Sequence, residues 1–220
     1  MKLNNIIIIC FFVTFNWINA QEASFNFFVG PSIPSKEVSE YFPNRLIETN
    51  DSINKNLMAN YQNVEIGYHI SIRGNINLSD NAYFYGSFGI HKFKVSELQL
   101  LSVSNLEQIG SMDVQTTIYP ISAGINYYLY DGLFRIYLNG GLDYNYQVNL
   151  LDNIESKYIL KLSQETTFSS LGFTFGPGFE IPLGKASLVI EANYSNLKFI
   201  GQSTNENSKS IKTLRLGLKF

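Results

Sequence analysis

The sequence contains a single cysteine, Cys10, which lies inside an apolar stretch near the N-terminus. The rest of the chain therefore has no thiol for a disulfide, a cysteine-ligated metal or a cysteine nucleophile. Charged residues are also scarce, at 15%, and a net charge of −2 without a basic patch argues against a nucleic-acid partner. After residue 20, no run of residues is apolar enough to form a membrane-spanning helix. Packing and hydrogen bonds alone must hold the fold.

The first twenty residues have the layout of a secretory signal peptide. Lys2 provides the positive start, residues 6–15 form a short apolar core, and Ala20 is the small residue before the expected cleavage point. The core is too short for a transmembrane helix, which disfavours the alternative of a retained N-terminal anchor. We therefore predict a signal peptide at 1–20 and a single domain at 21–220.

The chain is rich in aromatic residues and glycine, and most of it alternates apolar residues with polar or small ones. This period of two predicts β-strands with two different faces. Pro120 and Pro177 fall inside such segments, and since proline lacks a ladder donor, each is expected at a bulge or a strand end. The eight alternating segments cover residues 23–30, 61–78, 82–95, 116–130, 133–148, 168–183, 186–197 and 210–220.

The connections between these segments alternate between short and long. Short turns are expected at 78–81, 130–132 and 183–185, and long connections at 31–60, 97–114, 149–167 and 200–209. Short periplasmic turns and longer external loops are typical of outer-membrane barrels, and an even strand count places both termini on the periplasmic side. The sequence therefore predicts an all-β fold, an eight-stranded antiparallel up-and-down transmembrane β-barrel.

The residues of the polar face distinguish a lipid-facing barrel from a secreted, lipocalin-like barrel that binds an apolar ligand. A water-exposed exterior would carry many lysines and glutamates. The polar face is instead rich in glycine, which suits the narrow, side-chain-filled lumen of an eight-stranded barrel. We therefore expect the apolar face to contact lipid, with the secreted barrel as the alternative. The glycines are Gly67, Gly89, Gly124, Gly141, Gly172, Gly176, Gly178 and Gly217.

The last segment is expected to close the barrel by pairing with the first. Its apolar face would be an aggregation hazard on the open edge of a soluble sheet, but it suits a closed barrel in lipid. That face consists of Leu214, Leu216, Leu218 and Phe220, and it continues the face of Phe25, Phe27 and Val29 on the first segment.

The inward-facing charges occur in pairs of opposite sign on neighbouring segments. Counting residues from the turns places Arg135 near Glu180, and Glu191 near Arg215. We interpret these four residues as lumen ion pairs that offset the cost of desolvation. A gated polar path through the lumen is the functional alternative.

Three further polar residues, His69, His91 and Glu65, are expected to point into the lumen near the long connections. A hydrolase or acyltransferase would need a base and a nucleophile within reach of each other. No nucleophile elbow accompanies these residues, so we predict packed lumen histidines, no catalytic residue, no metal site and no cofactor. A lipid-modifying barrel enzyme is the alternative.

Five short motifs carry a resemblance to a known family: Tyr119–Ile121, Gly124–Tyr128, Gly140–Tyr144, Gly176–Glu180 and Leu216–Phe220. On these residues the chain resembles the outer-membrane β-barrel domain family abundant in Bacteroidota, a relative of small OmpA-type barrels. The resemblance implies outer-membrane lipids as the environment and carries no shared catalytic residues. The C-terminus also resembles the signal that the barrel-assembly machinery recognises, although Arg215 stands where a glycine is usual.

Together these observations predict a non-enzymatic integral protein of the cell outer membrane with a filled lumen and exposed loops. Its role would be structural, adhesive or accessory to a surface complex with an unidentified protein partner. A general diffusion porin is disfavoured because a water-filled channel needs more strands.

Overall fold

The computed structural model describes residues 23–35, 47–48, 57–60, 63–102, 108–156, 161–162, 165–198 and 209–220. The expected signal peptide and much of the long connections therefore lie outside the described residues. In the described part, no helix has the length and hydropathy needed to span a membrane.

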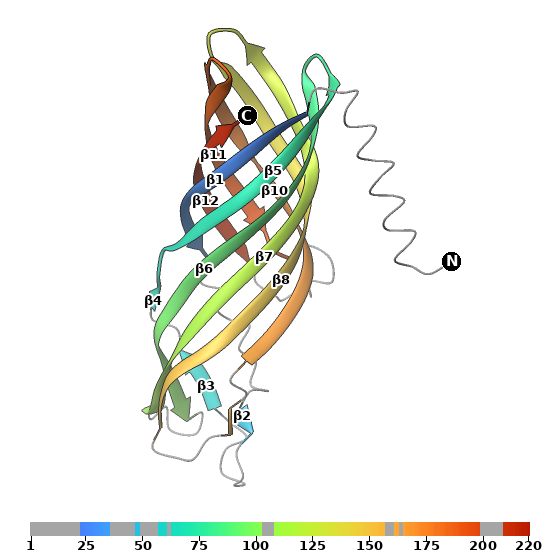
Figure 1. The fold of residues 1–220 in the computed structure, drawn as a ribbon. Helices are drawn as coiled ribbons and strands as arrows, with labels where there is room; N and C mark the ends of the chain where they lie inside the picture. The colour runs from blue at the N-terminus through green and yellow to red at the C-terminus, as the bar shows by residue number, and fades with distance from the viewer. Residues whose placement is uncertain are drawn as a thin grey trace, which may run out of the picture.

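Within the described residues, eight long strands form a closed antiparallel barrel, which confirms the predicted fold class (Figure 1). Around the barrel each strand pairs with the next in the order β6-β5-β1-β12-β11-β10-β8-β7, and β7 returns to β6. The strands are β1 (Ala23–Pro34), β5 (Gly67–Ser79), β6 (Ala82–Ser102), β7 (Gln108–Asp131), β8 (Arg135–Ser156), β10 (Glu165–Leu183), β11 (Ala186–Asn196) and β12 (Ser210–Lys219). Four short strands accompany them: β2 (Ile47–Glu48), β3 (Leu57–Asn60), β4 (Asn63–Val64) and β9 (Lys161–Leu162).

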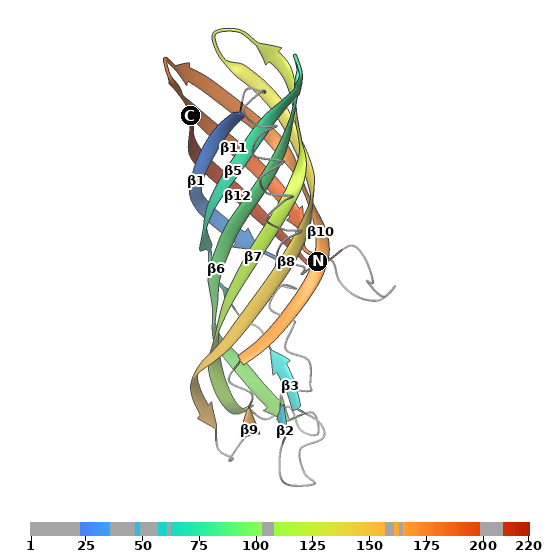
Figure 2. The same ribbon diagram turned by 45° about the vertical axis from the view of Figure 1, so that its right-hand side comes forward.

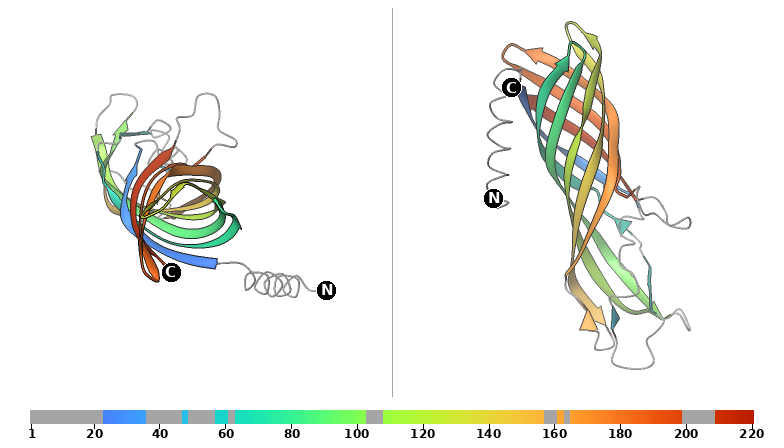
Figure 3. Two further views of the ribbon diagram at one scale, coloured as in Figure 1. Left: turned by 90° about the horizontal axis from the view of Figure 1, so that it is seen from above. Right: turned by 90° about the vertical axis from the view of Figure 1, so that its right-hand side faces the viewer.

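The first and last strands of the barrel form its closing seam. β1 and β12 are antiparallel, with Phe27 opposite Leu218 and Val29 opposite Leu216. Beyond the registered strand residues, the backbones of Phe25 and Phe220 exchange two hydrogen bonds of 3.0 and 2.9 Å. Viewed from above, the strands wrap around a common axis (Figure 3). A closed sheet leaves no unpaired edge to face lipid.

The two ends of the barrel differ. At the turn end, short turns join β5 to β6, β7 to β8 and β10 to β11, and the start of β1 and the end of β12 lie at the same end (Figure 1). In the turn between β10 and β11, Gly184 has a φ of 76°, a left-handed conformation that favours glycine. The opposite end, from which the long connections emerge, is the loop end.

One side of the barrel is much taller than the other. Strands β6, β7, β8 and β10 have 21, 24, 22 and 19 residues, whereas β1, β5, β11 and β12 have 10 to 13. A strand of about 9–11 residues suffices to cross the membrane. The taller strands therefore continue beyond the lipid at the loop end, where Figure 2 shows them running past the end of β1.

This extension corrects the expected connections at 97–114 and 149–167. β6 continues to Ser102, β7 begins at Gln108, β8 continues to Ser156, and β10 begins at Glu165. The alternating pattern fades there because neither face of the sheet meets lipid, while backbone pairing continues. The segment expected at 61–78 is also shorter as a barrel strand, since β5 begins at Gly67.

The two strand prolines mark gaps in pairing rather than bulges or strand ends. Pro120 on β7 pairs in register with Asn145 on β8, and Pro177 on β10 pairs in register with Leu138 on β8. On the opposite side of each strand the registered pairs skip the proline, toward β6 for Pro120 and toward β11 for Pro177. The ladder resumes with the same register, so each missing donor costs only a local interruption.

Candidate functional site in the barrel lumen

The two faces of the barrel reverse the arrangement of a soluble protein. Large apolar side chains point outward, with Leu142 63% exposed and Leu216 50% exposed. Charged side chains point inward, and Glu191 has no exposed surface. A lipocalin-like barrel would need the apolar residues inside. The outward face suits lipid, and the lumen is therefore where buried polar chemistry is concentrated.

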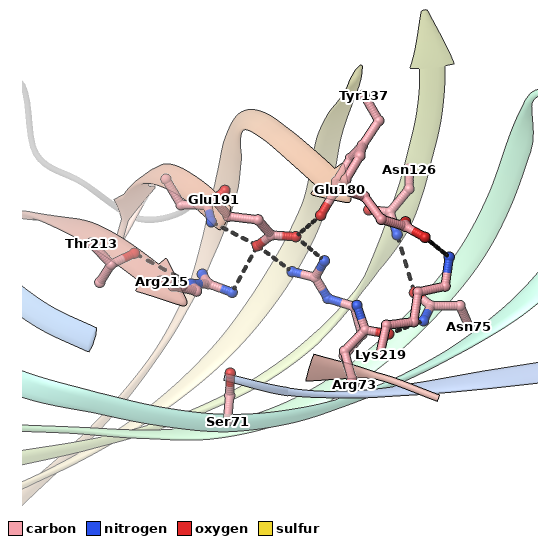
Figure 4. Close-up of polar contacts among 12 residues, drawn as sticks. Ser71, Arg73, Asn75, Asn126, Tyr137, Glu180, Glu191, Thr213, Arg215 and Lys219 are labelled. Atoms are coloured by element: carbon pink, nitrogen blue, oxygen red, sulfur yellow. Dashed lines mark hydrogen bonds and ion pairs between the residues drawn. The ribbon is translucent and has the colours of Figure 1, made fainter. Parts of the chain in front are cut away.

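A network around Glu191 fills the middle of the lumen (Figure 4). Both carboxylate oxygens accept hydrogen bonds from the Arg73 guanidinium, one of them at 3.0 Å. The Tyr137 hydroxyl donates to the same carboxylate at 2.6 Å, and the Asn193 amide donates at 3.0 Å. Arg215 lies 3.6 Å away from the second carboxylate oxygen. One anion is thus shared by two buried guanidinium groups.

Aromatic rings enclose the Arg73 side chain. Its guanidinium carbon lies 4.5 Å from the centroid of the Tyr85 ring and 4.9 Å from that of Phe28. Both distances fall in the range of cation–π attraction. The rings fit because glycines face them: a Cβ at Gly124 or Gly141 would collide with Tyr85. Small residues on one strand therefore make room for large inward residues on another.

A second network lies at the turn end and holds the end of the closing strand. Lys219 on β12 reaches across the lumen to Glu180 on β10, with the ammonium 3.0 Å from the nearer carboxylate oxygen. The Tyr128 hydroxyl on β7 donates to the same carboxylate at 2.8 Å. Arg135 contacts Glu180 at 3.1 Å and Asp131 at 2.8 Å. Figure 4 shows the pair of Lys219 and Glu180 beside the Glu191 network.

The structure places the four sequence-predicted ion-pair residues in these two networks. Arg135 stands opposite Glu180, and Glu191 stands opposite Arg215, in the registers of their strands. Sequence reasoning missed Arg73 as the main partner of Glu191, because β5 and β11 are not neighbours. The alternation of β5 puts Arg73 on the inward face, where it is 2% exposed. The contact of Arg73 with Glu191 across the lumen could not be predicted from the pairing of neighbouring strands.

On the loop side of the Glu191 network lies a small polar cavity. Its volume is about 20 Å³, enough for one or two water molecules. His69, His91, Asp143, Thr174 and Arg215 are among its lining residues. The cavity is too small for a lipid or another organic substrate.

The two histidines are packed against each other and against serines. Their ring centroids are 4.3 Å apart. His69 Nε2 lies 2.8 Å from the Ser71 hydroxyl, and His91 Nδ1 lies 3.0 Å from the Ser32 hydroxyl. Glu65 is exposed and precedes β5, so the expected inward cluster of these three residues does not form. Among the described residues, no group of three or more histidine, aspartate or glutamate residues could hold a metal ion.

An apolar layer covers this cavity toward the loop end. Phe93, Ile118, Leu197 and Ile211 form one buried cluster, and each is at most 3% exposed. Leu197 also lines the cavity. These residues occupy inward positions on or beside strands whose other inward residues are mostly polar. The sequence interpretation, which expected a polar lumen, missed them for that reason.

The described lumen residues therefore form three layers in sequence: the Glu180 network, the Glu191 network and the apolar layer. Its outward surface is an apolar band of a closed barrel. The family model for the outer membrane protein beta-barrel domain matches residues 46–220. The chain belongs to the outer membrane protein β-barrel domain family. This membership places the protein in the cell outer membrane and in contact with its lipids.

Three solved structures are similar to this chain. Neisserial surface protein A matches with a TM-score of 0.51 and 13% identity, covering 90% of this chain and 98% of that one. Ail of Yersinia pestis matches with a TM-score of 0.44, 13% identity and coverage of 90% and 99%. OprG from Pseudomonas aeruginosa matches with a TM-score of 0.48 and 14% identity, covering 91% of this chain and 97% of that one. No curated protein matches the sequence.

Proposed function

We propose that this outer-membrane barrel is a non-enzymatic protein with a sealed lumen that presents its loop end to the outside. Its role is structural, adhesive or accessory to a surface complex. The observation that carries the proposal is the layered lumen, in which two ion networks and an apolar layer follow one another and the described residues between them line a cavity of about 20 Å³. The tall strands β6, β7 and β8 support it, since they extend well beyond the length that crosses a membrane.

The same proposal includes a route to the membrane. Residues 1–20 act as a cleaved signal peptide, and the barrel-assembly machinery recognises the terminal strand through Leu214, Leu216, Leu218 and Phe220. Both termini of the barrel then face the periplasm, which is supported by the short turns at the same end. The motifs around Pro120 and Pro177 support a placement in the Bacteroidota branch of the family.

A lipid-modifying enzyme is less well supported than a sealed barrel. The histidines that such an enzyme would use are bonded to serines inside the lumen and lie beneath the apolar layer. Glu65, the expected third member, is exposed outside this cluster. Replacing both histidines by alanine is expected to leave the lipid composition of cells expressing the protein unchanged.

The decisive experiment is conductance in planar lipid bilayers. The purified protein, shown to be folded by heat-modifiable migration in a detergent gel, is expected to give no large steady currents. A wide porin added to the same bilayer is the positive control. Steady open-channel currents from the folded protein would refute the sealed lumen. Cell fractionation supplies the companion test, since recovery in a soluble fraction would refute membrane integration.

A further inference from the structure

Asp143 is a buried carboxylate outside the Glu180 and Glu191 networks. It lies on the inward face of β8, is 2% exposed and lines the small polar cavity. Its Oδ2 accepts a hydrogen bond from the Thr174 hydroxyl on β10. The Ser122 hydroxyl also approaches the carboxylate, but among the described residues no hydrogen bond of good geometry reaches Oδ1. Because a buried acceptor without a donor is costly, a donor is expected inside the cavity.

His69 lines the same cavity with a second buried atom that lacks a partner. Its Nε2 lies 2.8 Å from the Ser71 hydroxyl, whereas Nδ1 has no hydrogen-bond partner in the described part of the chain. If Nε2 donates to Ser71, Nδ1 is an acceptor, and if Nε2 accepts, Nδ1 carries the proton. The occupant of the cavity must therefore be able to pair with either state of Nδ1.

The hydroxyl groups beside Asp143 have already used their protons. Thr174 Oγ1 lies 2.7 Å from the Ser195 hydroxyl. Since the single hydroxyl proton of Thr174 is donated to Asp143, the Ser195 hydroxyl must donate to Thr174. The Ser195 oxygen keeps lone pairs that can accept a hydrogen bond. This side of the cavity thus offers acceptors, which suit an occupant that carries protons of its own.

The charges around the cavity favour a neutral occupant. Arg73 and Arg215 are balanced by Glu191 and Asp143, so with neutral histidines the middle of the lumen carries no net charge. A bound ion would leave an uncompensated charge in this buried region. Water is neutral and can both donate and accept hydrogen bonds. One water molecule needs about 10–15 Å³, and the cavity offers about 20 Å³.

We propose that the cavity is a hydration site in which Asp143 and His69 bind one or two water molecules. Water donates a hydrogen bond to Asp143 Oδ1, and it donates to or accepts from His69 Nδ1 according to the tautomer. The bound water supplies the partners that the strands themselves do not provide. The site lies on the loop side of the Glu191 network and beneath the apolar layer. It depends on the closed barrel and not on its biological role.

The first test is a crystal structure of the full mature protein at a resolution that shows ordered water, with crystals grown in sodium chloride and in rubidium bromide. One or two density peaks are expected in the cavity, about 2.7–3.2 Å from Asp143 Oδ1 or His69 Nδ1. No anomalous signal of rubidium or bromide should coincide with them. An empty cavity would overturn the proposal, and so would an anomalous peak, since it would identify an ion site.

The second test is X-ray footprinting of the folded wild-type protein in detergent micelles. Hydroxyl radicals formed from a bound water molecule oxidise the side chains beside it, so His69 should be oxidised although it is buried. Tyr137 is the internal control, because it is as buried as His69 and readily oxidised but is not among the residues that line the cavity. Oxidation of His69 no faster than that of Tyr137 would contradict water at its ring.

Two variants test the residues that hold the water. Asp143→Leu removes the acceptor, and oxidation of His69 should fall to the level of Tyr137. His69→Leu, read through His91 on the cavity wall, keeps the test open if Asp143→Leu yields no heat-modifiable protein. Asp80→Leu is the matched control, because Asp80 is exposed in the turn between β5 and β6, and it should leave the oxidation of His69 unchanged. Wild-type oxidation in both lumen variants would overturn the assigned roles.

Failure of the hydration site can be told apart from failure of the proposed function. A dry cavity in a heat-modifiable barrel that conducts no current contradicts the hydration site and leaves the sealed barrel intact. Steady currents from a barrel whose cavity holds ordered water contradict the sealed lumen and support the site.

Discussion

Glu191→Gln should destabilise the barrel more than the removal of either arginine that contacts it. Glu191 is fully buried and is the anion shared by Arg73 and Arg215. Glutamine keeps the shape of the side chain but removes its charge, so Arg73 and Arg215 lose the carboxylate that they share. Arg73→Met, in contrast, leaves Glu191 with Arg215, Tyr137 and Asn193.

The magnitude follows from the cost of breaking a buried ion pair, about 3–5 kcal/mol. Glu191→Gln should fall near the upper limit, about 5 kcal/mol, and Arg73→Met near the lower limit, about 3 kcal/mol. Glu65→Gln is the control, since an exposed carboxylate should change stability by less than about 0.5 kcal/mol.

The assay is urea unfolding in lipid vesicles, followed by the fraction of heat-modifiable protein on a gel. Tryptophan fluorescence is unsuitable, because Trp17 is the only tryptophan of the chain and lies in the expected signal peptide. Far-ultraviolet circular dichroism gives a second measure of the same transition. The reasoning is refuted if Glu191→Gln unfolds at the same urea concentration as the wild type, or if Arg73→Met is the less stable of the two.

Three further perturbations test the packing, the lipid face and the seam. Gly178→Ala would push a Cβ into the Tyr137 ring and should cost about 1–3 kcal/mol in the same assay, whereas Gly86→Ala, with nothing within 4 Å, should cost nothing. Leu216→Arg on the lipid face should lower the free energy of unfolding by about 2–4 kcal/mol, whereas Leu183→Arg beside a turn should lower it by at most about 1 kcal/mol. Equal losses of stability in the two variants would contradict the placement of the lipid band. Deletion of residues 210–220 should abolish heat-modifiable protein in membrane fractions, because β1 and β11 would be left with open edges. A truncated protein that still integrates would disprove closure by β12.

The sequence was sufficient to predict the strands and their faces wherever lipid imposes alternation. Pairing along the seam follows from the same alternation, which is why Phe27 and Leu218 could be assigned to one outward surface. Past the lipid that constraint ends, and the extension of β7 to Gln108 left no signal in the pattern. Sequence therefore predicts the membrane-spanning part of such a barrel better than its extensions.

Contacts across the lumen were the other part that the sequence could not supply. Hydrogen bonding between two neighbouring strands fixes which residues face each other, so Arg135 and Glu180 could be expected to meet. Arg73 and Glu191 are separated by β1 and β12, and their contact depends on barrel diameter and on which inward residues are small. The inward glycines that admit Tyr85 and Tyr137 were visible in the sequence, but the rings that fill their space were not assigned to them.

The buried ion networks lie close to the short seam between β1 and β12. β1 and β12 have 12 and 10 residues, so they form far fewer ladder hydrogen bonds than β7 and β8 can. Arg73 and Glu191 come from the two strands that flank this seam, and Lys219 ties the end of β12 to β10. The ion networks therefore lie where the ladder is shortest. Once the barrel has closed, these charges are shielded from water, so each buried carboxylate depends on its cationic partners and the loss of one partner destabilises the closed barrel.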